Sequence, residues 1–153
     1  MYHIVLVEPE IPQNTGNISR TCAVTGAALH LIRPLGFSID DRHLKRAGLD
    51  YWKDLDLRLY DSFSELEAQN PGARFWMLST HAEKSYAQAA FRDGDFLVFG
   101  KETAGLGPAL LARHADTALR IPMRAGQRSL NLSNAAAIVL YEALRQGGFP
   151  CMR

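Results

Sequence analysis

Cysteine is scarce in this chain of 153 residues: the two present, Cys22 and Cys151, lie far apart and lack the spacing of metal ligands. A single distant pair is weak support for a disulfide scaffold. No apolar run approaches the ~20 residues that a membrane helix needs, and the first residues lack the basic segment of a signal peptide. The five histidines are scattered, without an i, i+4 pair. We therefore expect a cytoplasmic protein with no metal site and no membrane segment.

An excess of charge of one sign is also missing. The chain has 17 Lys and Arg against 16 Asp and Glu, a net charge of +1. Proteins that hold nucleic acid by bulk charge usually carry a clear basic excess. An RNA site here therefore has to be a local patch or be assembled from two subunits. The densest basic stretch, 42–46, follows two aspartates, a pattern that favours a solvated helix surface over an RNA patch.

What the chain does contain is a regular alternation of short apolar segments and helical patterns. The apolar segments are bounded by polar or turn residues, as in buried parallel strands. They are Tyr2–Val7, Ala28–Ile32, Leu57–Tyr60, Phe75–Leu78, Phe96–Phe99 and Ala118–Ile121. Alternation over the whole length predicts a single α/β domain, residues 1–153, with a mainly parallel sheet and helices on both faces.

Three helices are predicted, two from the residues that can cap their starts and one from its apolar spacing and its end. The aspartates at 40 and 41 can cap one that runs to Ala47. Ser62 and Glu65 form a capping box for Phe63–Gln69. The last helix ends at the glycine pair 147–148, and its apolar residues recur at helical spacing: Ala136, Val139, Leu140, Ala143 and Leu144.

Three loops depart from both patterns, and ligands of such folds bind where loops follow the carboxyl ends of the strands. The first loop, Glu8–Arg20, lacks the G-x-G-x-x-G sequence of a dinucleotide site. We expect Asn14 to cap a helix that runs from there to about Gly26. Arg20 would then be an exposed arginine within that helix.

The second loop, Phe99–Gly107, contains Gly-Lys-Glu-Thr but is not a P-loop, because Asp95 stands where that motif needs a glycine. Its three glycines indicate either a close backbone approach or turns with positive φ.

The third loop, Ile121–Asn134, leads into the last helix, which Ser133 or Asn134 can cap. Ser129 and Asn131 stand just before that helix, where polar groups can converge on a ligand. A loop of this length, rich in small polar residues, is more often functional than a simple connection.

The loops carry P-x-N-T-G-N-I-x-R at 12–20, F-G-K-E-T-A-G-L at 99–106 and R-S-L-N-L-S-N-A-A-A-I-V-L-Y-E at 128–142. Together, in this order, they resemble the SPOUT methyltransferases, specifically the short tRNA 2′-O-ribose methyltransferases of the TrmL (YibK) type. The similarity runs over nearly the whole chain. One departure is Gly107-Pro108, where relatives often have proline directly after Gly-Leu.

The resemblance implies an α/β fold whose C-terminal part is threaded into a deep trefoil knot, and a homodimer. It implies S-adenosyl-L-methionine as the cofactor. Carried over position by position, the cofactor contacts are Leu78, Gly100, Ile121, Met123, Ser129 and Leu130. Aliphatic walls with backbone donors and acceptors suit the flat, apolar adenine ring.

The same resemblance implies Arg20 as the catalytic residue. Because a guanidinium stays protonated, we expect a fixed cation near phosphate and the developing alkoxide, with water or an RNA phosphate as proton acceptor. The expected RNA contacts are Arg20, Glu102, Arg124 and Asn131. Glu102 could instead orient Arg20 or the RNA, or be a solvated loop acid. The expected substrate is cytidine or uridine at the tRNA wobble position, within an anticodon stem-loop. Alternatives are another tRNA position, ribosomal RNA, or a non-catalytic RNA-binding or assembly protein on this fold.

Overall fold

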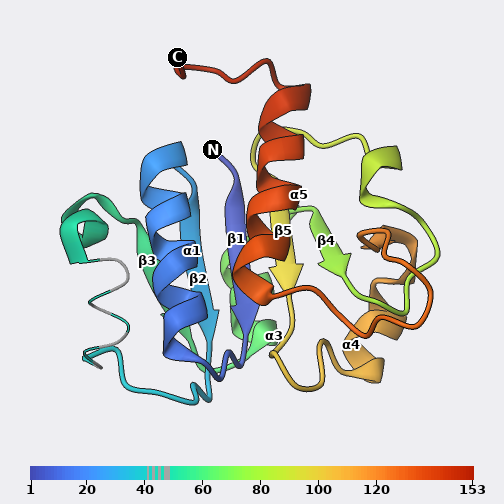
Figure 1. Ribbon diagram of the computed structural model, residues 1–153, viewed down its shortest axis with the longest axis horizontal. Helices are drawn as coiled ribbons and strands as arrows, with labels where there is room; N and C mark the ends of the chain where they lie inside the picture. Colours follow the sequence, from blue (N-terminus) through green and yellow to red (C-terminus); the bar gives the residue numbers. More distant parts are fainter. Residues whose placement is uncertain (41, 43, 45, 47–48) are drawn as a thin grey trace.

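Six parallel strands form one sheet in the computed structural model, which describes residues 1–40, 42, 44, 46 and 49–153. The strand order is β3-β2-β1-β5-β4-β6 (Figure 1). The strands are β1 (His3–Val7), β2 (Ala28–Ile32), β3 (Leu57–Tyr60), β4 (Phe75–Leu78), β5 (Phe96–Phe99) and β6 (Ala118–Leu119). All six predicted strands are present; β1 begins one residue later than predicted and β6 ends two residues earlier.

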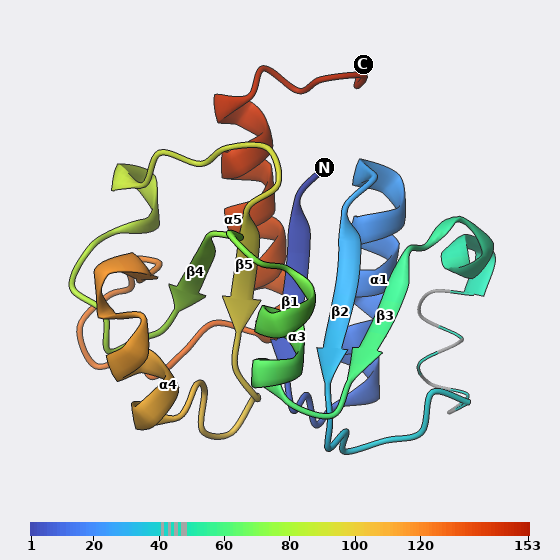
Figure 2. The same cartoon turned by 180° about the vertical axis from the view of Figure 1, so that it is seen from behind.

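Helices cover both faces of this sheet, which confirms the predicted fold class. Figure 1 shows α1 (Pro12–Thr25) and α5 (Leu132–Gln146) side by side on one face. Figure 2 shows α3 (Phe63–Gln69) and α4 (Pro108–Arg113) on the other. Short 3-10 helices complete the described elements: η1 (Leu49–Asp54), η2 (Tyr86–Gln88) and η3 (Ala115–Thr117). The predicted basic helix through residue 47 falls in large part on positions outside the described residues.

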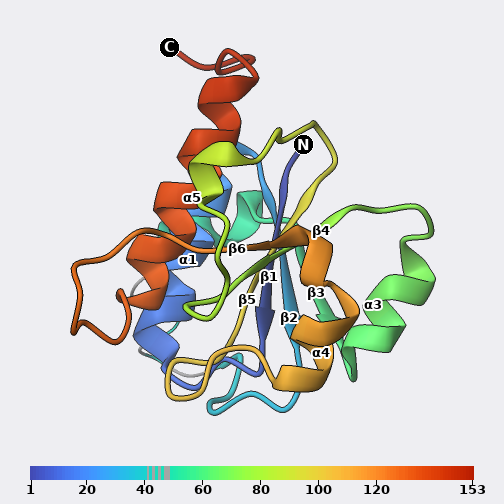
Figure 3. The ribbon, with the colours of Figure 1, turned by 90° about the vertical axis from the view of Figure 1, so that its right-hand side faces the viewer.

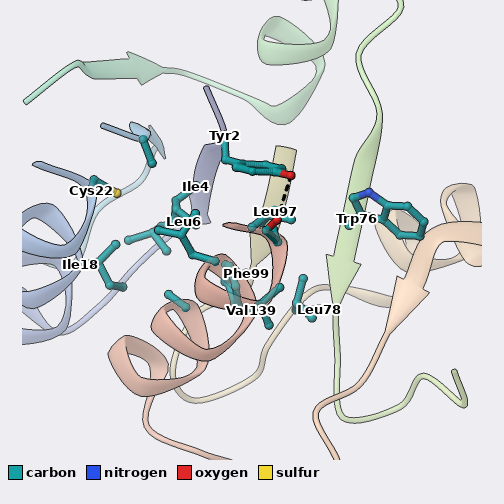
Figure 4. Close-up of a cluster of buried hydrophobic side chains, with 14 of the residues drawn as sticks. Tyr2, Ile4, Leu6, Ile18, Cys22, Trp76, Leu78, Leu97, Phe99 and Val139 are labelled. Carbon is teal, nitrogen blue, oxygen red and sulfur yellow. Dashed lines mark hydrogen bonds between the residues drawn. The ribbon is translucent and has the colours of Figure 1, made fainter. Parts of the chain in front are cut away.

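Each face of the sheet has its own apolar core, because successive strand residues point to opposite sides. In β1, Ile4 and Leu6 pack toward α1 and α5, whereas Val5 packs toward α3. Figure 4 shows the first core, in which the Tyr2 hydroxyl donates a hydrogen bond of 3.1 Å to the carbonyl of Ala143. This bond ties the amino end of the sheet to the last helix.

The last helix confirms the predicted apolar stripe and corrects its cap. The five residues predicted to form the stripe are all buried. The helix begins at Leu132, and Asn131 is its cap, because Asn131 Oδ1 accepts from the backbone N–H groups of Ser133 at 2.9 Å and Asn134 at 3.2 Å. The prediction of Ser133 or Asn134 as cap was wrong because the helix starts earlier than its apolar stripe.

The cap predicted for the first helix was also wrong. Helix α1 begins at Pro12, which suits the first helical position because proline lacks an N–H group that would need a partner there. Asn14 therefore lies inside the helix, and the cap position belongs to Ile11, whose side chain has no oxygen. The helix ends at Gly26 as predicted, with a φ of 76°.

The cap of α3 is confirmed in part. Ser62 Oγ accepts from the backbone N–H of Glu65 at 3.1 Å, as a capping box requires. The Glu65 carboxylate accepts instead from the backbone N–H of Asp61, at 2.7 Å, rather than from that of Ser62. Ser62 and Glu65 therefore do not bond to each other's backbone in both directions, as a full capping box would, because the Glu65 carboxylate binds the residue before Ser62.

Because all strands are parallel, their carboxyl ends share one edge of the sheet. Helices α1 and α5 begin at this edge, and the loop after β5 turns there (Figure 1). Figure 3 shows from the side how the chain leaves β6 and makes a long loop before α5 begins. The trefoil knot that the resemblance implies stays a prediction.

Candidate functional site

A cavity of about 440 Å³ opens at the carboxyl edge of the sheet. Its walls come from the end of β4 and the residues after it, the loop after β5, and the chain between β6 and α5. It brings together all six residues predicted to hold the cofactor: Leu78, Gly100, Ile121, Met123, Ser129 and Leu130. Among the described residues, none before Leu78 lines it, so the first loop lies outside the cavity.

The cavity has the size and chemistry of a small-molecule site, for which about 300–1,000 Å³ is usual. Leu78, Ile121 and Leu130 provide apolar walls suited to a flat aromatic ring. Ser79 and Thr80, directly after β4, add polar groups that the sequence reasoning did not single out. Their position at the carboxyl end of a predicted strand was the signal that could have found them. This donor set fits the adenosine and amino-acid parts of S-adenosylmethionine.

Gly100 is required by the loop itself. A Cβ atom at this position would lie 2.1 Å from the carbonyl carbon of Gly105 and 2.2 Å from the nitrogen of Leu106. The close backbone approach that the glycines indicate is therefore made within the loop rather than toward a ligand. Gly105 has the positive φ, 65°, and its N–H donates to the carbonyl of Lys101 at 2.8 Å.

Glu102 directs its carboxylate at the start of α1. It accepts from the backbone N–H groups of Glu10 at 2.9 Å and Ile11 at 2.7 Å, and from Asn14 Nδ2 at 3.1 Å. The first N–H groups of a helix have no partner within the helix, and a carboxylate also suits the positive end of the helix dipole. Glu102 thus binds the segment that enters α1, namely the N–H groups of Glu10 and Ile11 just before Pro12, while no side chain caps the N–H groups of the first helical turn.

Two further contacts join the same elements. Glu10 Oε1 accepts from the backbone N–H of Thr103 at 3.0 Å and from its hydroxyl at 2.7 Å, and these bonds lower the pKa of Glu10. Asn131 Nδ2 donates to Asn14 Oδ1 at 3.0 Å, while Asn131 Oδ1 caps α5. The starts of α1 and α5 and the loop after β5 therefore form one hydrogen-bonded unit beside the cavity.

The arginines predicted to contact RNA lie outside the cavity. Arg20 is exposed on α1, about two turns after Pro12 at 3.6 residues per turn. Arg124 is exposed in the loop between β6 and α5. Arg128, in the same loop, does line the cavity, and the sequence reasoning missed it. Of the four predicted RNA contacts, the structure joins Glu102 and Asn131 through Asn14 and leaves both arginines at the surface.

Within the described part of the chain, no group of three or more His, Cys, Asp or Glu side chains could hold a metal ion. No helix in that part is long and apolar enough to cross a membrane.

Known proteins are similar to this chain in sequence and in fold. The SpoU rRNA Methylase family matches residues 1–141. A Burkholderia pseudomallei protein named tRNA (cytidine(34)-2′-O)-methyltransferase is 52% identical over 153 residues, covering 97% of each chain. A structure described as “Structural insights into the 2-OH methylation of C/U34 on tRNA” is 53% identical, with a TM-score of 0.92 and 97% of each chain covered. The SpoU methyltransferase AviRb from Streptomyces viridochromogenes, solved with the cofactor AdoMet, is 27% identical with a TM-score of 0.79, covering 95% of this chain and 57% of AviRb.

Proposed function

This chain belongs to the SpoU rRNA Methylase family, and we propose that it methylates the ribose 2′-hydroxyl of cytidine or uridine at the tRNA wobble position, using S-adenosylmethionine. The observation that carries the proposal is the cavity at the carboxyl edge, where the six expected cofactor residues converge. Relatives whose sequences align with nearly the whole chain, with about half of the residues identical, are named for action on tRNA, and this supports the tRNA substrate. We place the reaction in the cytoplasm and on the anticodon stem-loop.

When bound, S-adenosylmethionine supplies a methyl group that its sulfonium already activates. The chain itself has to hold the ribose in line with that methyl group, exclude water and stabilise charge on the 2′-oxygen. Leu78, Ile121 and Leu130 provide the apolar walls of the site that holds the cofactor. The loops beside the cavity are fixed by the hydrogen bonds of Glu102 and Asn131 described above.

Arg20 is the residue that we assign to the reacting oxygen. Its exposure on α1 lets RNA reach it, and a guanidinium remains charged at every physiological pH. Its planar group binds phosphate through two parallel hydrogen bonds. We therefore assign Arg20 the tasks of holding the RNA backbone and stabilising negative charge as the 2′-oxygen attacks, rather than removing the proton.

We further propose a homodimer that uses the exposed apolar surface of α1 and α5. Val24 on α1 and Ile138 and Tyr141 on α5 are exposed by 52%, 36% and 43%. The two helices that carry these residues lie side by side on the same face of the sheet (Figure 1). A chain of net charge +1 offers little positive surface for a folded RNA. A second copy doubles the surface available to the tRNA.

The test is mass spectrometry of nucleosides from unmodified tRNA after incubation with protein and S-adenosylmethionine. We expect 2′-O-methylcytidine or 2′-O-methyluridine at the wobble position. Arg20→Ala should lower the single-turnover rate about a hundredfold to a thousandfold and leave cofactor affinity unchanged. Arg20→Lys should be nearly as slow with a similar pH dependence, because lysine keeps the charge and loses the planar fork.

The matched control is Arg92→Ala, an exposed arginine that precedes β5 at the opposite, amino edge of the sheet. It should methylate at the wild-type rate. Substantial activity of Arg20→Lys that rises steeply with pH would assign Arg20 the role of base. Wild-type rates in both Arg20 variants would remove it from the mechanism. Methylation of ribosomal RNA alone would refute the tRNA substrate.

A further inference from the structure

The exposed Arg20 and the cavity come from separate parts of the chain, and α1 contributes no wall to the cavity among the described residues. The proposed reaction needs both in a fixed geometry, since a misplacement of about 1 Å can cost about a hundredfold in rate. Glu102 is placed to set that geometry. It lines the cavity and also bonds to the first residues of α1.

The start of α1 depends on this distant carboxylate. Ile11 at the cap position offers no oxygen, and no side chain of the helix's own segment caps it. Glu102 Oε1 accepts from Glu10 N, and Oε2 accepts from both Ile11 N and Asn14 Nδ2. The reverse bonds, from Thr103 to the Glu10 carboxylate, tie the two segments together a second time. Two carboxylates thus cross between the loop after β5 and the entry to α1.

Packing holds this segment from the other side. A Cβ atom at Gly36 would lie 2.6 Å from the carbonyl oxygen of Glu10, so the chain at Gly36 presses directly on the backbone that Glu102 binds. Asn14 also bonds to Asn131, which follows the cavity residues Ser129 and Leu130. The first turn of α1 is therefore bonded to two cavity loops and packed against a third segment.

We propose that Glu102 is a positioning residue for methyl transfer: it sets α1, and with it Arg20, relative to the cofactor cavity. This inference rests on the function proposed above. It assigns the Glu102 carboxylate to α1 and not to RNA, because protein donors take three of its about four acceptor positions. The carboxylate acts through α1, and Arg20 acts on the substrate.

A pair of substitutions separates positioning from contact. In Glu102→Gln an amide NH₂ group replaces one oxygen and faces a donor, whichever way the amide turns. We expect the single-turnover rate to fall about a hundredfold, with tRNA and cofactor affinities close to wild type. Asn14→Asp alone should also be slow, since two carboxylates then face each other. In the variant that combines both substitutions, the amide NH₂ group at position 102 can donate to a carboxylate at position 14, while the amide oxygen still accepts from the N–H of Glu10. The NH₂ group still faces the N–H of Ile11, so we expect this variant to recover part of the rate.

Ser62→Ala is the control, because it removes a side-chain hydrogen bond to the backbone at the start of another helix, α3, away from the site. It should lower the unfolding midpoint without slowing methyl transfer. A wild-type rate in Glu102→Gln, a loss explained by weaker tRNA binding, or no recovery in the combined variant would each overturn the proposal.

Hydrogen exchange supplies a readout that needs no activity. The backbone N–H groups of Glu10 and Ile11 should exchange faster in Glu102→Gln. In the combined variant the N–H of Glu10 should recover protection, because the remaining amide oxygen can accept from it, whereas the N–H of Ile11 should still exchange fast, because it faces the amide NH₂ group. Unchanged exchange refutes the positioning role. A wild-type protein that methylates no tRNA, but shows this exchange pattern, would refute the proposed substrate and leave the role of Glu102 supported.

Discussion

Acid should destabilise this fold through a pair of hydrogen-bonded histidines on neighbouring strands, His30 buried and His3 half-buried. His3 Nδ1 lies 2.9 Å from His30 Nε2, and His30 Nδ1 lies 2.9 Å from the Tyr60 hydroxyl. His30 is fully buried, and the His3 ring stacks on Phe96 at a centroid distance of 4.1 Å. Only one proton fits between the two imidazoles, so charging both rings breaks their hydrogen bond. The pair is therefore stable in its neutral form.

The pKa values of the two histidines determine whether acid raises or lowers the stability of the fold. Burial, with the neighbouring His3 and Arg58, lowers the pKa of His30 to about 3, and burial lowers the pKa of His3 as well. An unfolded histidine titrates near 6.5, so between these values the unfolded chain binds more protons and stability falls as the pH falls. For His30 alone, lowering the pH from 7.5 to 5 should cost about 2 kcal/mol of the free energy of unfolding.

Urea unfolding at pH 7.5 and pH 5 measures this loss. His30→Gln removes the titrating ring and keeps an amide that can donate and accept, so we expect a less stable protein whose pH dependence over this window is smaller by about 2 kcal/mol. His81→Gln, at an exposed position, should keep the wild-type pH dependence. An equal loss on acidification in wild type and His30→Gln would refute the reasoning.

Two other predictions test the loop after β5 and the proposed dimer. Gly100→Ala should lower the free energy of unfolding by about 1–3 kcal/mol or more, because its Cβ meets backbone on the far side of the loop. An unchanged urea midpoint would contradict that packing. Ile138→Asp with Tyr141→Glu should turn the dimer into a monomer of 17.0 kDa by light scattering, because charges are costly in an apolar interface. A wild-type protein that is monomeric and fully active at assay concentration would refute the dimer.

Helix starts mark the limit of what local pattern could predict. The cap of α3 came from Ser62, a residue of the same segment, and was predicted. A local rule assigned the cap of α1 to Asn14, but no side chain caps this helix. The segment that enters α1 is instead bonded by Glu102, 91 residues after Ile11. For α5 the predicted cap was wrong by only two or three residues, because the true cap, Asn131, belongs to the same segment as the helix. The helix begins before its apolar stripe, and the prediction had placed its start at the stripe.

The six residues expected to hold the cofactor were predicted only through the resemblance of the three loops to a family, since no single loop pointed to them. Their convergence in one cavity depends on the strand order β3-β2-β1-β5-β4-β6, which brings the ends of β4 and β5 beside the chain that leaves β6. Ser79, Thr80 and Arg128 joined the cavity for the same reason. Sequence spacing carries no information about that proximity.

The sequence alone determined the six strands, the apolar stripe of α5 and the α/β class, because burial imposes a period on neighbouring residues that can be read locally. Only the tertiary structure decided the roles of Glu102, Asn14 and Asn131. The side-chain bonds that join Asn14 to Glu102 and to Asn131 span 88 and 117 residues, and such contacts arise when parallel strands bring their carboxyl ends to one edge. A polar side chain at that edge can form the same kinds of hydrogen bond with a ligand, with RNA or with another part of the protein. The partners seen in the structure are what tell these roles apart.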